Sequence, residues 1–200
     1  MTQGFTLFET PIGLCGLAWG EQGLVGAQLP EAAPGAAWNR LRRRYPEAVE
    51  ASPPPPPIQR VVERVNDLLA GGRDDLVDIE LDFTIVSPFN RRVYEIARAI
   101  APGQTLTYGQ IAKAISKTGD DPALGQGLGA RAVGKALGEN PWPIIVPCHR
   151  VLGADGKSGG FSAPGGVETK ARMLTIERAR TNDVPTLFDL EFSVAPQRGR

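Results

Sequence analysis

The segment from Pro141 to Arg150, with the sequence Pro-Trp-Pro-Ile-Ile-Val-Pro-Cys-His-Arg, constrains the fold of this chain most strongly. Its three apolar residues, Ile144 to Val146, lie between two prolines. A short apolar run bounded in this way is typical of a buried segment that ends in a turn. A glycine-rich stretch, 153–166, begins three residues after Arg150. We therefore predict that the turn presents Cys148 beneath a mobile loop.

Cys148 is one of only 2 cysteines in the chain, and it is followed by His149, the only histidine. A thiol reacts as its thiolate, and with a pKa of about 8.5 it is mostly protonated at neutral pH. A neighbouring imidazole can act as a base or a cation and lower that pKa. The pair alone does not establish a reactive site, because most isolated cysteines are buried and adjacent side chains on an extended segment point apart. The other cysteine, Cys15, lies in an apolar strand pattern and is expected to be inert core.

The composition excludes several classes of protein. A hydrophobic content of 42% and a charged content of 22% are ordinary for a globular chain. Two cysteines cannot form a disulfide framework, and with a single histidine they cannot form a zinc cluster, so we expect no metal and no cofactor. No apolar run approaches about 18 residues, and no basic-then-apolar signal opens the chain. We therefore expect a cytoplasmic protein with no membrane contact.

The charges are distributed unevenly, although the formal net charge is zero. Residues 1–84 carry 7 basic and 12 acidic side chains, whereas residues 85–180 carry 13 basic and 7 acidic ones. A positive field on one half of a chain is what a polyanion such as nucleic acid requires. The arginine run at 40–44 is more typical of a solvated helix face than of a second nucleic-acid patch.

The first 84 residues show the patterns of a small α/β domain with nothing catalytic in it. Residues 4–29 alternate short apolar runs with glycine, which predicts strands joined by hairpin turns. Apolar spacing predicts helices over 36–45 and 58–69, with five prolines between them as an extended spacer. Strict alternation over 78–85 predicts a further strand.

The second half shows the order of elements of a winged helix-turn-helix. A helix is predicted over 91–100, and the sequence Thr107-Tyr-Gly-Gln110 fits a capping box that opens a short second helix. A further helix is predicted over 130–137, followed by a short strand and a loop. We therefore assign 85–180 to a winged helix-turn-helix domain and 181–200 to a C-terminal tail.

The helix predicted over 130–137 has few side chains for reading base edges, apart from Arg131 and Lys135. Its alanines and glycine would let the backbone approach a surface closely, which suits sequence-independent binding in a minor groove. Tight packing against another helix would explain the same small residues equally well.

The sequence Asn140-Pro-Trp-Pro-Ile-Ile-Val-Pro-Cys-His-Arg-Val151, preceded by Arg131-Ala-Val-Gly134, closely resembles the signature of the methylated-DNA–protein-cysteine methyltransferases, or O6-alkylguanine-DNA alkyltransferases. Residue matches run from about 87 to 177, nearly half of the chain. The resemblance implies a monomeric, single-turnover DNA-repair methyltransferase. Its substrate would be double-stranded DNA carrying O6-alkylguanine or O4-alkylthymine, bound through the minor groove with the target base flipped out. The resemblance also implies a ribonuclease H-like fold for the N-terminal domain.

The same resemblance implies a catalytic set of four residues. Cys148 would be the alkyl acceptor, His149 its base, and Glu177 the carboxylate that orients the histidine. Asn140 would join the helix-turn-helix to the active-site turn. The thioether product is stable, so one molecule would repair one lesion and then be spent.

A second set of residues is implied to contact the substrate or the DNA. Arg131 would fill the space left by the flipped nucleotide, and Tyr108 would crowd the neighbouring phosphate and touch the guanine. The main-chain carbonyl of Val151 would accept from the guanine amine, and the backbone N–H of Ser162 would face O6. Lys170 is assigned to the same set.

Three features depart from the family pattern. The turn over 116–129 is roughly nine residues longer than usual, and it contains two adjacent aspartates. Phe161, also assigned to the substrate side, stands where a tyrosine is usual. Ala163-Pro164 resembles an insertion in the loop over the pocket. These differences bear on the rate and on which alkyl groups fit.

Three alternatives remain open at this point. A non-catalytic lesion-binding protein of the same fold would carry tryptophan in place of Cys148. A winged-helix DNA-binding regulator would need a second helix richer in base-reading side chains. A Cys-His hydrolase would need an oxyanion hole, and no candidate for one is evident.

Overall fold

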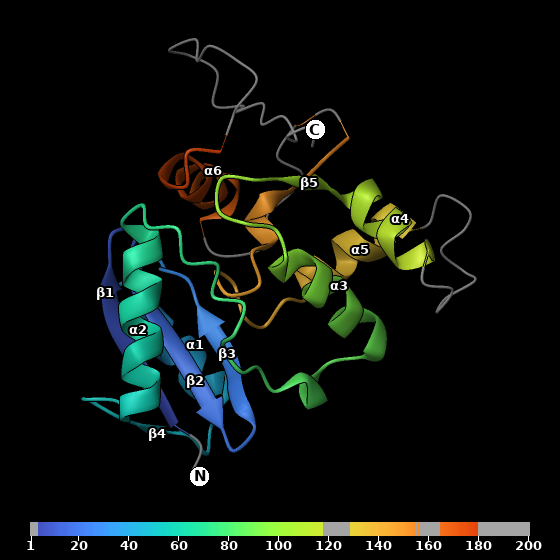
Figure 1. The fold of residues 1–200 in the computed structure, drawn as a ribbon. Helices are drawn as coiled ribbons and strands as arrows, with labels where there is room; N and C mark the ends of the chain where they lie inside the picture. The colour runs from blue at the N-terminus through green and yellow to red at the C-terminus, as the bar shows by residue number, and fades with distance from the viewer. Residues whose placement is uncertain (1–3, 118–128, 155, 157–164, 180–200) are drawn as a thin grey trace.

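The computed structural model describes residues 4–117, 129–154, 156 and 165–179. Its N-terminal half contains a four-stranded sheet in the order β3-β2-β1-β4 (Figure 1). β1 pairs with β2 and β2 with β3 in antiparallel fashion, whereas β4 runs parallel to β1. The three strands predicted within 4–29 are confirmed. The four strands are β1 (Gly4–Thr10), β2 (Gly13–Gly20), β3 (Gly23–Gln28) and β4 (Val49–Glu50).

Two helices cover the opposite faces of this sheet (Figure 1). Successive side chains of a strand point to opposite faces, so β2 contributes to two separate clusters. On one face α1 (Ala36–Arg44) buries Leu41 against Phe5, Ala18 and Val25. On the other face α2 (Pro56–Leu69) packs through apolar residues in one cluster with β2, including Val62, Val65, Cys15, Leu17 and Trp19.

The helix α2 begins at Pro56, two residues before the predicted start, so the proline-rich spacer is shorter than expected. Proline is tolerated in the first helical turn, because the N–H that it lacks would have no partner there and its φ already suits the helix. A run of prolines can therefore end an extended segment and open a helix at the same time.

The prediction of a strand over 78–85 is wrong. Residues 83–85 form a short 3₁₀ helix, η1 (Phe83–Ile85), and Leu81 makes only an isolated bridge with Leu24. The Asp82 carboxylate accepts hydrogen bonds from the backbone N–H and the hydroxyl of Thr84. This local capping competes with a strand. Alternation therefore reflects burial of Ile79 and Leu81 in the core and not a continuous ladder.

The C-terminal half is mainly helical (Figure 1), and its last helix contacts the short 3₁₀ turn that begins at Cys148. The predicted capping box is confirmed, since the Thr107 N–H donates to Gln110 Oε1 at 2.7 Å and the Gln110 N–H donates to Thr107 Oγ1 at 3.1 Å. β5 and β6 form a two-stranded parallel pair. The elements are α3 (Pro88–Arg98), β5 (Leu106–Thr107), α4 (Tyr108–Lys117), α5 (Gly129–Gly138), η3 (Cys148–Arg150), β6 (Val151–Leu152) and α6 (Gly166–Ile176).

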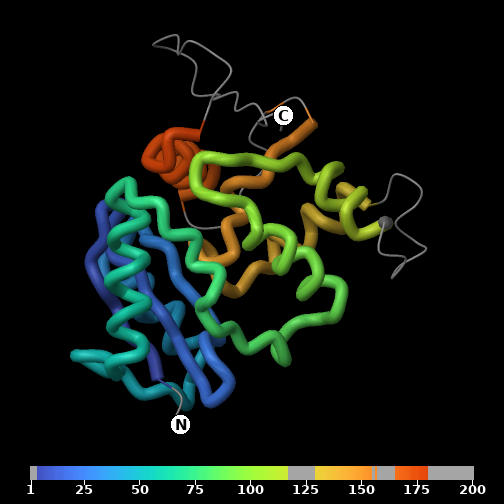
Figure 2. Tube along the Cα trace, in the orientation of Figure 1, coloured from blue at the N-terminus to red at the C-terminus, as the bar shows by residue number. Residues whose placement is uncertain are grey.

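The two halves are joined by hydrogen bonds and by a shared hydrophobic core. The chain after α5 runs beside β3, where the Ala27 N–H donates to the Pro141 carbonyl at 2.8 Å (Figure 2). Arg98 of α3 donates to the carbonyls of three residues, Leu76, Val77 and Ile79. The boundary at residue 84 stays a prediction. In the described part of the chain, no helix has the length and apolar character needed to cross a membrane.

Candidate active site

A hydrogen-bonded turn between α5 and η3 places Cys148. The Asn140 side chain closes it, because Nδ2 donates to the Val146 carbonyl and Oδ1 accepts from the Trp142 N–H, both at 2.9 Å. The Val146 N–H also donates to the Trp142 carbonyl at 2.8 Å. Ile144 has a φ of 78°, a conformation that a β-branched residue adopts only under constraint. The buried segment predicted before Cys148 is therefore present as a tightly closed turn.

The Cys148 thiol is buried, with 8% of the residue exposed, and it is not in a disulfide. Burial raises its pKa, while a hydrogen bond with Asn140 and the positive charge of Lys170 act in the opposite direction. From the sequence, the neighbouring imidazole was a group that could lower this pKa. The net shift is upward, because the loss of hydration outweighs the effect of the neighbouring groups.

His149 and Glu177 lie in direct contact beneath the turn. His149 Nε2 is 2.9 Å from Glu177 Oε1, and both side chains are almost fully buried. Burial lowers the pKa of His149, although the charge of Glu177 opposes this shift, so the ring is held as a neutral base. The second ring nitrogen, Nδ1, is buried without a hydrogen-bond partner among the described residues. The ring therefore has one nitrogen on Glu177 and one free to take a proton.

Arg150 completes this cluster and was not given a role by the sequence. Its guanidinium donates to both oxygens of Glu177, at 2.9 and 2.7 Å, and to the Ile100 carbonyl. Burial by itself would raise the pKa of Glu177, but the charge of His149 in its protonated form, the hydrogen bonds of His149 and Arg150, and the charge of Arg150 bring it down to about 2. The adjacency of a histidine and an arginine in the sequence was the only local signal for this arrangement.

Lys170 of α6 is fully buried and lies near the thiol. Its Nζ donates to the Val151 carbonyl at 2.7 Å. Burial lowers the pKa of Lys170 to about 8, and a negative charge on Cys148 would oppose that shift. A carbonyl oxygen has two acceptor positions, so Val151 keeps one for a second donor. The structure thus brings Lys170, Val151 and Cys148 together.

Arg131 lies on the exposed side of α5. The Tyr108 ring packs against the same helix at Gly134. No ion pair joins Arg131 to any described residue. A Cβ on Gly134 would meet only the Tyr108 ring, at 3.9 Å, which is an ordinary contact. Close helix packing therefore does not require glycine at position 134. The inward face of α5 instead consists of buried Val133, Ala136 and Leu137.

Several predicted features lie outside the described residues. They are Phe161 and Ser162, the insertion at 163–164, and positions 118–128 of the long turn. Among the residues that are described, no group of three or more His, Cys, Asp or Glu side chains could hold a metal ion.

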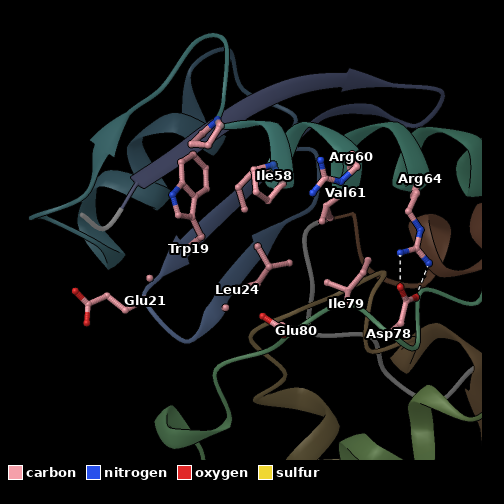
Figure 3. Close-up of a pocket in the computed structure, with 14 residues that line it drawn as sticks. Trp19, Glu21, Leu24, Ile58, Arg60, Val61, Arg64, Asp78, Ile79 and Glu80 are labelled. Atoms are coloured by element: carbon pink, nitrogen blue, oxygen red, sulfur yellow. Dashed lines mark hydrogen bonds and ion pairs between the residues drawn. The ribbon is translucent and has the colours of Figure 1, made fainter. Parts of the chain in front are cut away.

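A separate cavity of about 370 Å³ lies in the N-terminal half, between the β2–β3 hairpin, the first turns of α2 and residues 78–80 (Figure 3). Arg64 at its rim is already neutralised by Asp74 and Asp78, at 2.6 Å each. Its lining includes neither cysteine nor histidine, so it does not belong to the site of Cys148.

Comparison with known proteins identifies the family. A family model described as 6-O-methylguanine DNA methyltransferase, DNA binding domain, matches residues 88–179. The Mycobacterium tuberculosis methylated-DNA–protein-cysteine methyltransferase is 38% identical over 150 residues, which cover 74% of this chain and 83% of that protein. A Thermus thermophilus DNA base-flipping protein is 39% identical over 120 residues, covering 60% of this chain and 73% of that protein.

Solved structures agree with the sequence comparison. The crystal structure of Mycobacterium tuberculosis OGT in complex with DNA matches with a TM-score of 0.65 and 31% identity, covering 88% of this chain and 92% of that one. The mixed α/β fold is therefore that of known O6-methylguanine methyltransferases. Fold, signature and identity over most of both chains lead to one conclusion: this chain belongs to the methylated-DNA–protein-cysteine methyltransferase family.

Proposed function

We propose that this chain repairs DNA by moving the alkyl group of O6-alkylguanine onto Cys148. The observation that carries the assignment is the turn itself, which holds a free thiol beside Asn140 and Lys170 and directly before the His149–Glu177 pair. The other cysteine, Cys15, has no comparable surroundings. Family membership gives the reaction, and the geometry favours this residue as its acceptor.

The reaction follows from the residues around the thiol. The Cys148 proton passes to neutral His149, and since Nδ1 makes no hydrogen bond to the described protein, one water molecule can bridge the two groups. A sulfur electron pair then forms the bond to the alkyl carbon, and the electrons of the carbon–O6 bond leave with the guanine. Glu177 stabilises the imidazolium that results, as the third member of a nucleophile–base–orienter set.

The departing guanine carries the electron pair of the carbon–O6 bond, so a hydrogen bond stabilises it as an anion and a proton taken up from water makes it neutral. Burial raises the pKa of Tyr108, so its hydroxyl keeps its proton and can donate to the base. The remaining acceptor position of the Val151 carbonyl suits the guanine amine. The thioether has no partner that would cleave it, which makes the protein a single-use reagent.

The DNA-binding part of the proposal rests on α4 and α5, as the helix pair of a winged helix-turn-helix. The exposed Arg131 and the small, half-buried Gly134 lie one turn apart on α5, which would allow close approach to a minor groove. Arg131 would occupy the gap left by a flipped nucleotide. The N-terminal sheet, ribonuclease H-like in this proposal, supports the turn through the bond from Ala27 to Pro141.

A stoichiometry experiment tests this function. A fixed amount of protein is incubated with a large excess of duplex DNA containing O6-methylguanine, and the repaired DNA is counted over time. We expect repair to stop when one lesion has been repaired per protein molecule. Continuous turnover would indicate a hydrolase, and binding without any repair would indicate a lesion-binding protein.

A further inference from the structure

Tyr94 of α3 connects the helix α5 to the turn that carries Cys148. Its hydroxyl donates to the Ala136 carbonyl in the last turns of α5, at 2.7 Å, and both residues are buried. Its ring meets the indole of Trp142 edge-on, with centroids 5.9 Å apart and planes at 90°. One side chain therefore touches both elements, the exposed helix and the reactive turn.

Trp142 fixes the other end of this connection. It is fully buried, and its Nε1 donates to the Leu24 carbonyl of β3 at 2.7 Å. Its own backbone carbonyl accepts from Val146, and its backbone N–H donates to Asn140, so the same residue also closes the turn. A second ring, Phe83, packs edge-on against it at 5.4 Å. The indole thus has little freedom to move relative to the sheet.

We propose that Tyr94 is a positioning residue that sets the distance between α5 and the Cys148 thiol. The inference rests on the proposed function. A nucleotide flipped out of duplex DNA remains attached to the strand that α5 holds. Its alkyl carbon therefore reaches the sulfur only if helix and turn keep a fixed separation, and errors of about 1 Å in such distances slow reactions strongly.

A free base is not attached to DNA, so α5 does not hold it, and its reaction depends far less on where α5 lies. This difference separates positioning from general stability. Tyr94→Phe keeps the ring on Trp142 but removes the hydroxyl that holds Ala136. The connection to α5 is weakened, whereas the turn around Cys148 keeps all its own hydrogen bonds.

The experiment compares single-turnover rates on O6-methylguanine duplex DNA and on a free O6-alkylguanine base, well below the melting temperature. We expect Tyr94→Phe to lower the ratio of duplex rate to free-base rate about tenfold. Trp142→Phe removes the bond to Leu24 and disturbs the turn itself, so it should slow both reactions alike.

Tyr45→Phe is the matched control. The Tyr45 hydroxyl also donates to a backbone carbonyl, that of Val25 at 2.8 Å, but it lies in the N-terminal half. This variant should leave the ratio unchanged even if it melts earlier. An unchanged ratio in Tyr94→Phe, or the same fall in Tyr45→Phe, overturns the inference. A wild-type protein that transfers no alkyl group would instead refute the proposed function.

Discussion

The strand around Cys15 and the turn around Cys148 each bury a free thiol, but they surround it differently. Cys15 is fully buried in β2, where it pairs with Phe8 across the ladder and touches the Thr10 hydroxyl at 3.6 Å. Burial raises its pKa to about 12. Cys148 also has a raised pKa, but whereas only the Thr10 hydroxyl opposes burial at Cys15, an amide and a positive charge, Asn140 and Lys170, oppose it at Cys148.

Because both cysteines are buried and free, neither property by itself determines which of them is reactive. A regular strand satisfies its own backbone groups and surrounds a side chain with apolar neighbours. The irregular turn after α5 instead gathers an amide, an ammonium group, a histidine and a carboxylate at one point. Reactivity is thus expected where backbone regularity is interrupted and polar groups converge.

The largest expected effect is the loss of one thiol. Cys148→Ser should abolish transfer completely, because an alcohol is a far weaker nucleophile than a thiolate, while DNA binding persists. Cys15→Ala should keep full transfer and lose only some stability from the small cavity. Methyl transfer from labelled DNA measures both variants. Transfer that survives in Cys148→Ser would remove the distinction between the two regions.

The next effect concerns the buried base and its carboxylate. His149→Ala and Glu177→Gln should each slow transfer about 10²-fold or more, since a positioned base contributes on this order. Both should slow duplex and free-base reactions equally, because they act on the thiol. Single-turnover rates on the two substrates provide the check, and a fall confined to duplex DNA would contradict this role.

Arg131 should affect only the duplex reaction. Unstacking a base costs a few kcal/mol, so Arg131→Ala should slow duplex repair by about 10²-fold and hardly change the free-base reaction. Lys135→Ala is the matched control on the same helix, since its side chain is 80% exposed and pairs only loosely with Glu139, at 3.9 Å. Equal slowing on the free base would mean that Arg131 is structural.

At low pH, the turn that carries Cys148 should lose its structure before the strand β2 does. The pKa of Glu177 in the folded protein, about 2, lies below its ordinary value of 4.5. Its contribution to stability is therefore complete above pH of about 4.5 and is lost as the pH falls towards about 2. Hydrogen exchange should show the amides of Val146, Cys148, His149 and Arg150 losing protection in this window before those of β2. In Glu177→Gln that early loss should be absent, and its persistence would contradict the assignment.

The smallest effect is expected at Gly134, with opposite signs for stability and function. Alanine favours a helix over glycine by about 1 kcal/mol, and the added methyl meets only the Tyr108 ring at 3.9 Å. Gly134→Ala should therefore raise the melting temperature while weakening DNA binding several-fold. Thermal unfolding measures the effect on stability, and titration with DNA measures the effect on binding. A destabilised variant would indicate that close helix packing is the reason for glycine at position 134.

Local patterns in the sequence predicted the elements that depend on near neighbours. The first three strands and the Thr107–Gln110 capping box were predicted, because apolar spacing and caps act over a few residues. The strand over 78–85 was not formed, because side-chain capping by Asp82 and burial in the shared core decide that segment. Alternation of apolar residues alone cannot distinguish a paired strand from an irregular segment with alternate residues buried.

The site was predictable only where a motif or a resemblance named its residues. The contact of His149 with Glu177 was predicted by resemblance, and the structure places them 2.9 Å apart. The bonds from Arg150 to Glu177 join residues 27 positions apart, which no local pattern reports. The direction of the Cys148 pKa shift depends on burial, which appears only when the chain is folded.

The most direct test of Cys148 as the alkyl acceptor is to locate the transferred methyl group. Wild-type protein is reacted with excess duplex DNA containing O6-methylguanine, digested, and its two cysteine-containing peptides are weighed by mass spectrometry. We expect one methyl group per molecule, on the peptide with Cys148, and an unmodified Cys15 peptide. A methyl group on Cys15, or repaired DNA with both cysteines unmodified, would contradict this assignment.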